Sequence, residues 1–64
     1  MDLLQYNNKT VKLFTKTGNI YQGRAYFCDA EDYETEEDGL SIKNEQDKKF
    51  YGFAESEIKS IELV

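Results

Sequence analysis

Apolar and polar residues alternate in short runs along this chain, and turn-forming residues separate the runs. Between Lys9 and Thr15, Val11 and Leu13 alternate with polar positions, and the run from Gly39 to Asn44 alternates in the same way. A period of two is typical of a strand with one buried face. We therefore expect both runs to be half-buried strands.

A longer run extends from Ile20 to Asp29, and its ten residues exceed the usual strand length. A glycine inside a strand often marks a bulge or a corner, so Gly23 is the expected bend. We expect the alternation to change phase there, so that both halves turn apolar side chains inward. Before this run, Lys16–Asn19 predicts a tight turn in which Gly18 or Asn19 takes a positive φ.

The rest of the chain supplies further short elements. Lys49–Phe53 predicts an aromatic strand, Ala54–Glu57 a single tight turn with Ser56 accepting backbone N–H groups, and Ile58–Val64 a closing strand. Met1–Asn8 predicts a short helical turn or an irregular lead-in. Five short strands with a long, bent second strand predict one domain over residues 1–64: an all-β, strongly bent antiparallel barrel.

The charge is uneven along the chain: the net charge is −5, but one segment carries −7, and the eight Lys and Arg and six acids elsewhere give about +2. Seven of the thirteen acids lie in that segment: Asp29, Glu31, Asp32, Glu34, Glu36, Glu37 and Asp38. We expect an exposed loop that repels phosphate backbones, while the lysines elsewhere are scattered along the sequence. Nucleic acid is therefore not an expected partner, although the sequence does not exclude a basic face elsewhere on the protein.

Residues for catalysis and cofactor binding are scarce. The chain has no histidine and no glycine-rich phosphate loop, and we expect its single cysteine, Cys28, to be a small core residue. Glu34 to Glu45 has the oxygen spacing of a calcium loop, but no helical pattern flanks it, so we expect no metal site. We predict no enzyme activity, no cofactor and no small-molecule substrate. With no apolar run long enough for a membrane and one lone cysteine, a cytoplasmic location is expected.

Two parts of the chain resemble a known family. Val11-x-Leu13, Gly18 and Tyr21-x-Gly23-Arg-Ala-x-x-x-Asp29 together resemble the first motif of Sm-like proteins, in which a glycine bends the second strand and an aspartate follows six residues later. Ile58-Lys-Ser-Ile61 resembles the closing strand of the second motif. The resemblance covers roughly residues 10–63, and the chain looks similar to short bacterial Sm-like proteins with an acidic loop. It implies a small five-stranded barrel.

The chain departs from the family at the positions that contact RNA. RNA-binding Sm proteins have an asparagine four residues after the aspartate, where this chain has Tyr33, and an Arg-Gly pair where it has Ala54-Glu55. An RNA-binding ring protein, with Asp29 and Tyr33 on its RNA side, is therefore the alternative interpretation.

The main interpretation is a non-enzymatic module for protein–protein interaction or self-assembly. Sm-like barrels join edge to edge, the fourth strand of one copy pairing with the fifth of the next. The resemblance thus implies an interface, or homo-oligomer contact, at Tyr51, Phe53, Ile61 and Leu63. The same four residues are also compatible with ordinary packing inside one barrel.

Overall fold

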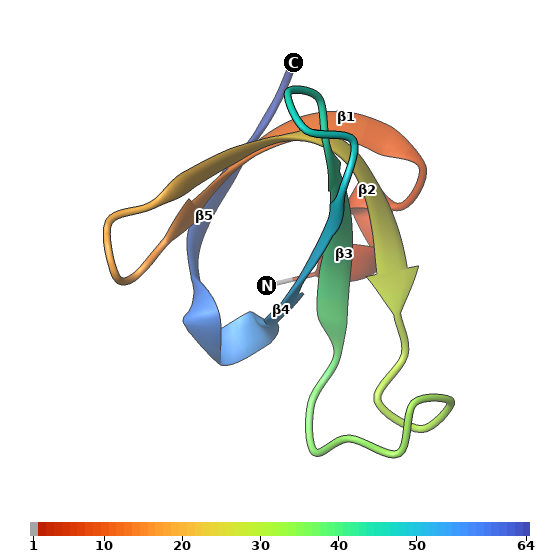
Figure 1. Cartoon of the computed structure of the whole chain (residues 1–64). Helices are drawn as coiled ribbons and strands as arrows, with labels where there is room; N and C mark the ends of the chain where they lie inside the picture. Colours follow the sequence, from red (N-terminus) through yellow and green to blue (C-terminus); the bar gives the residue numbers. More distant parts are fainter. Residues whose placement is uncertain (1) are drawn as a thin grey trace.

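In the computed structural model, which describes residues 2–64, the chain forms one antiparallel sheet of five strands (Figure 1). The strands are β1 (Lys9–Thr15), β2 (Ile20–Cys28), β3 (Gly39–Asn44), β4 (Phe50–Ala54) and β5 (Ile58–Leu63). Two 3₁₀ turns accompany them, η1 (Leu3–Tyr6) and η2 (Glu55–Glu57). The order across the sheet is β4-β3-β2-β1-β5. The all-β, antiparallel prediction is confirmed, as is the short N-terminal turn; Met1 of the expected lead-in lies outside the described residues.

Strand β2 is the centre of the sheet and changes partners along its length. Its residues 20–25 pair with β1, and its residues 23–28 pair with β3. Gly23 belongs to both sets, and a Cβ atom built on it would lie 1.8 Å from the carbonyl oxygen of Lys43. Only glycine permits such a close approach of β3 to β2 without displacing the backbone. The sequence therefore places the glycine at the position where the sheet bends.

The bend does not change the phase of the alternation, contrary to expectation. Ala25 is fully buried, and Tyr21 and Phe27, on the same face of β2, pack against the core. The register of β2 runs through Gly23 without a bulge on either side, so one face points inward along the whole strand. The register shift in the sheet lies instead between Phe14 and Thr15, where β1 pairs with β5.

The turn before β2 has the predicted geometry. Gly18 has a φ of +92°, the left-handed region that favours glycine. The Thr15 amide donates to the Asn19 carbonyl at 2.9 Å, and the Asn19 amide donates to the Thr15 hydroxyl at 3.0 Å. Thr15 therefore closes the hairpin with both its backbone and its side chain.

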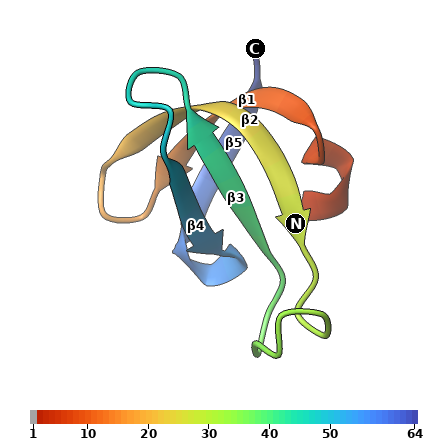
Figure 2. The same cartoon turned by 45° about the vertical axis from the view of Figure 1, so that its right-hand side comes forward.

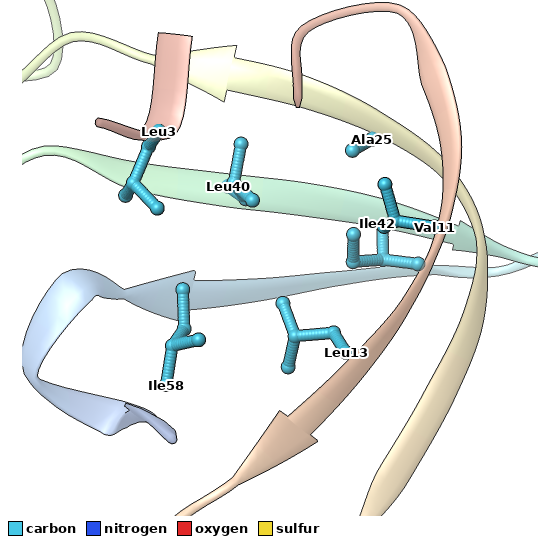
Figure 3. Close-up of a cluster of buried hydrophobic side chains, with 7 residues drawn as sticks. All are labelled: Leu3, Val11, Leu13, Ala25, Leu40, Ile42 and Ile58. Carbon is cyan, nitrogen blue, oxygen red and sulfur yellow. The ribbon is translucent and has the colours of Figure 1, made fainter. Parts of the chain in front are cut away.

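The core lies inside the curl of the sheet (Figure 3). It consists of seven buried apolar side chains: Leu3, Val11, Leu13, Ala25, Leu40, Ile42 and Ile58. Strands β1, β2, β3 and β5 supply six of them, and η1 adds Leu3, which is only 2% exposed. The N-terminal turn is therefore part of the core rather than a loose lead-in.

The sheet curls strongly but does not close into a barrel. Among the described residues, β4 pairs only with β3, and β5 pairs only with β1. Figure 1 shows β4 and β5 on the two sides of the opening, joined by η2, and Figure 2 shows β4 crossing in front of β5. Inside the curl, aromatic contacts connect β2 with β4: the Tyr21 ring centre lies 5.1 Å from that of Tyr51 and 4.8 Å from that of Phe53. The expected closure into a barrel is therefore wrong: the two edge strands, β4 and β5, do not pair with each other.

None of the helical segments in the described part of the chain is long and apolar enough to cross a membrane.

Candidate functional site

The acidic segment, residues 29–38, links β2 to β3 and projects beyond the sheet (Figure 1, yellow-green to green). It is a loop, as the sequence indicates, but its own carboxylates hold its shape. Asp29 accepts hydrogen bonds from the amides of Glu31 at 2.8 Å and Asp32 at 3.4 Å. Asp38 accepts one from the amide of Ala30 at 2.8 Å. Part of the acidity is therefore used in building the loop.

The acidic segment is also tied to η2. The carboxylate of Glu37 accepts a hydrogen bond from the Ser56 amide at 2.6 Å, and the Glu55 amide donates to the Asp38 carbonyl at 2.9 Å. The turn itself is held by Glu57, whose carboxylate accepts from the Ala54 amide at 2.9 Å, and not by the Ser56 hydroxyl that the sequence suggested. Loop and turn thus form one connected structure at the end of β4.

A pocket of about 500 Å³ lies between this loop and the sheet. The loop contributes Tyr33, Thr35, Glu36 and Glu37, and the strands contribute Cys28, Gly39, Leu40, Gly52, Phe53 and Ala54. The volume falls in the range of ligand pockets in proteins. Apolar residues from the strands and two acidic residues from the loop therefore line the same space.

Part of the pocket floor belongs to the outer face of the sheet, the face opposite the core. Cys28 pairs with Gly39, and Gly39 pairs with Ala54, so these three residues lie on the same face of the sheet. Leu40, next to Gly39 in β3, points into the core, so the face of Gly39 is the outer one. Gly52 lies on the outer face as well, and a Cβ built on it would meet no heavy atom within 4 Å. The missing side chain at Gly52 therefore leaves open space over β4.

Cys28 is not the core residue that the sequence predicts. It is half-buried, lies outside the buried cluster and lines the pocket as a free thiol. The reason is the unbroken alternation of β2, which turns Cys28 to the face opposite Ala25 and Phe27.

The two positions of the RNA alternative lie at the start of the same loop. The Tyr33 amide donates to the Asp29 carbonyl at 3.1 Å, so one turn connects them. The Asp29 carboxylate is occupied by loop amides, whereas the Tyr33 side chain is 64% exposed and lines the pocket with Glu36 and Glu37. An aromatic ring is available here, but its neighbours in the lining are acidic.

The four interface candidates lie on the two edge strands, with their side chains toward the inside of the curl. Phe53 pairs with Leu40 and Tyr51 with Ile42 on β3, while Ile61 pairs with Leu13 and Leu63 with Val11 on β1. Phe53 and Ile61 pack against the core, and Leu63 is 63% exposed.

Tyr51 is held in place by the turn before β4. Its hydroxyl donates a hydrogen bond to the carboxylate of Asp47. This bond lowers the pKa of Asp47 and raises the pKa of Tyr51, because it stabilises the charged carboxylate and the neutral phenol. The ring of Tyr51 therefore has a defined position at the open edge.

The fold also gathers cations that are scattered in the sequence. Arg24, Lys43 and Lys48 line a hollow of about 310 Å³ together with Thr10, Asn44 and Glu45. Thr10, Arg24 and Lys43 form one cross-strand row, which becomes visible only when the strand register is known. The gap over β4 has a local signal that the sequence prediction did not use: Gly52 lies between the aromatic residues Tyr51 and Phe53.

Among residues 2–64 there is no group of three or more histidine, cysteine or acidic side chains arranged to hold a metal ion. In comparisons with protein-family models, curated proteins and solved structures, nothing matches this chain.

Proposed function

We propose that this protein is a non-enzymatic, Sm-like module, in which the curled but open five-stranded sheet self-associates through its two free edges. The Sm-like part of the proposal is supported by the glycine at the bend of β2, by Asp29 directly after that strand, and by the one-turn connection before β5. The non-enzymatic part is supported by the lack of histidine in the sequence.

The observation that carries the proposal is the open edge of β4. This strand reads Phe-Tyr-Gly-Phe-Ala and contains neither a charged residue nor a proline. Natural edge strands are usually protected by lysine, proline or a bulge, because their free N–H and C=O groups otherwise pair with another chain. An uncharged edge is therefore suited to receive a further strand.

The other open edge, β5, offers a matching surface. In an antiparallel pair between copies, Phe53 opposite Ile61 and Tyr51 opposite Leu63 would place all four apolar side chains on the inner face. Such a pair would extend the inner apolar surface of each copy, which is small because the core contains seven buried apolar residues.

The RNA-binding alternative has weaker support. The exposed Tyr33 ring offers a stacking surface, but Glu36 and Glu37 line the same pocket and repel a phosphate chain.

Light scattering behind a sizing column tests the assembly. We expect a mass that is a multiple of 7.5 kDa at high micromolar concentration, and a shift toward the monomer in Leu63→Lys. Leu4→Lys is the matched control, because Leu4 is similarly exposed but lies on η1, away from both edges. A wild-type monomer, or an equal effect of both substitutions, would refute edge-to-edge assembly.

A further inference from the structure

The pocket beside the acidic segment combines two kinds of surface. Its floor over β4 is apolar and contains the open space at Gly52, while the acidic segment contributes Tyr33, Glu36 and Glu37 to its wall. No lysine or arginine of the chain is among the lining residues. The acidic wall therefore has no cationic side chain from this chain beside it.

Lysine and arginine side chains have the matching chemistry. Each has an aliphatic stem that packs on apolar surface and a charged end that stays near water or a carboxylate. An aromatic ring adds a cation–π attraction for the charged end. A neutral apolar side chain would match the floor but would not neutralise the negative charge of Glu36 and Glu37.

We propose that the pocket binds a lysine or arginine side chain of a basic peptide segment in a partner protein, with the stem over Gly52 and the charged end at Glu36 and Glu37. This goes beyond edge-to-edge assembly, because the pocket opens on the outer face of the sheet and the edge hydrogen bonds of β4 lie in its plane. Binding at the pocket and pairing at the edge are thus separable.

Hydrogen bonds within the protein hold the Glu37 part of this wall in place. One oxygen of the Glu37 carboxylate accepts the Ser56 amide, and the Thr35 hydroxyl donates to the Glu37 carbonyl at 3.0 Å. A carboxylate that is already held in place loses little side-chain entropy when it meets a cation. Charge complementarity with a basic segment also favours encounter and selects against acidic partners.

The test uses a fluorescein-labelled heptapeptide with a single central arginine, flanked by serine and valine, in anisotropy titrations at about 50 mM salt. We expect the arginine and lysine versions to bind, and the version with citrulline, a neutral analogue of arginine, to bind about tenfold more weakly. Equal binding of the citrulline peptide, or no binding of the arginine peptide, would overturn the proposal. So would binding of labelled oligouridine in preference to the arginine peptide.

Three variants locate the site. Gly52→Leu fills the open space and should abolish peptide binding, while Glu36→Gln should weaken it by about tenfold. Glu31→Gln is the matched control, because it removes the same charge from the acidic segment but lies outside the pocket lining. Unchanged binding in Gly52→Leu, or equal losses in Glu31→Gln and Glu36→Gln, would show that the pocket is not the site.

Light scattering on the same variants separates this proposal from the assembly. Unchanged oligomeric mass together with lost peptide binding supports a distinct pocket, whereas a monomeric wild type that still binds the arginine peptide refutes only the edge-to-edge assembly. Loss of folding in Gly52→Leu would leave the Glu36→Gln and Glu31→Gln pair as the deciding comparison.

Discussion

Replacement of Gly23 by alanine tests the physical origin of the bend in the sheet. The added Cβ would lie 1.8 Å from the Lys43 carbonyl oxygen and 2.7 Å from its carbonyl carbon. Real Cβ atoms essentially never approach other atoms within 3.0 Å, so the oxygen must move by about 1.2 Å at least. Because this oxygen belongs to the backbone of β3, it cannot move without the strand.

The energetic cost follows from that displacement. Forcing extra volume into a packed site costs about 1–3 kcal/mol, and each backbone hydrogen bond lost between β2 and β3 adds about 1 kcal/mol. We therefore expect Gly23→Ala to lower the free energy of unfolding by about 3 kcal/mol. A domain of 64 residues has a total of about 3–10 kcal/mol at typical stability per residue, so the variant should be near the limit of folding.

Urea unfolding followed by far-ultraviolet circular dichroism measures the effect. Gly52→Ala is the matched control: the same change in the same sheet, but with no heavy atom within 4 Å of the new Cβ. Since alanine lowers the entropy of the unfolded chain, this control should be neutral or stabilising by up to about 1 kcal/mol. A free energy of unfolding for Gly23→Ala within about 0.5 kcal/mol of the control would refute the reasoning.

Three further predictions concern the core, the β4 edge and the acidic segment. Leu13→Ala should lower the free energy of unfolding by about 2–5 kcal/mol, because Leu13 is fully buried. Tyr51→Phe should raise the pKa of Asp47 toward its ordinary value, as followed by the carboxyl carbon shift in NMR. The hydrogen bond from Tyr51 to Asp47 contributes its full stabilisation at pH values above the pKa of Asp47 in the unfolded chain. This contribution is lost as the pH falls through the lowered pKa of Asp47 in the folded protein. Glu37→Ala should speed hydrogen exchange at the Ser56 amide by about tenfold, since it removes the acceptor.

Each of these has a control of the same chemistry. Leu4→Ala removes an exposed leucine and should change stability by less than about 0.5 kcal/mol. Tyr26→Phe should leave the pKa of Asp47 unchanged, and Glu36→Ala should leave exchange at the Ser56 amide unchanged. An equal effect of control and test variant in any pair would contradict the interaction concerned.

The strand boundaries could be predicted from the sequence because the signals are local. Val11 and Leu13 alternate with polar residues inside β1, and the turn after it is marked by Gly18, whose φ is positive as predicted. The aromatic run of β4 and the short turn before β5 lie within one residue of the expected positions. Local periodicity and turn chemistry suffice for these features.

The faces of β2 beyond Gly23 could not be predicted in the same way. A glycine in a strand permits either a bulge, which shifts the phase, or a close approach of another strand, which keeps it. The choice depends on the Lys43 carbonyl, which is distant in sequence, so it is a tertiary effect. Because the phase is kept, Cys28 lies on the outer face, and the pocket floor forms there.

The register of β1 with β5 has a consequence for folding kinetics. Val11 pairs with Leu63, about 50 residues away, while β1–β2 and β3–β4 are hairpins with short turns. Contacts between distant residues form slowly, so the local hairpins should appear first and β5 last, giving folding on a millisecond-to-second timescale. Until β5 docks, the free side of β1 is itself an unprotected edge, so aggregation should compete with folding at that step.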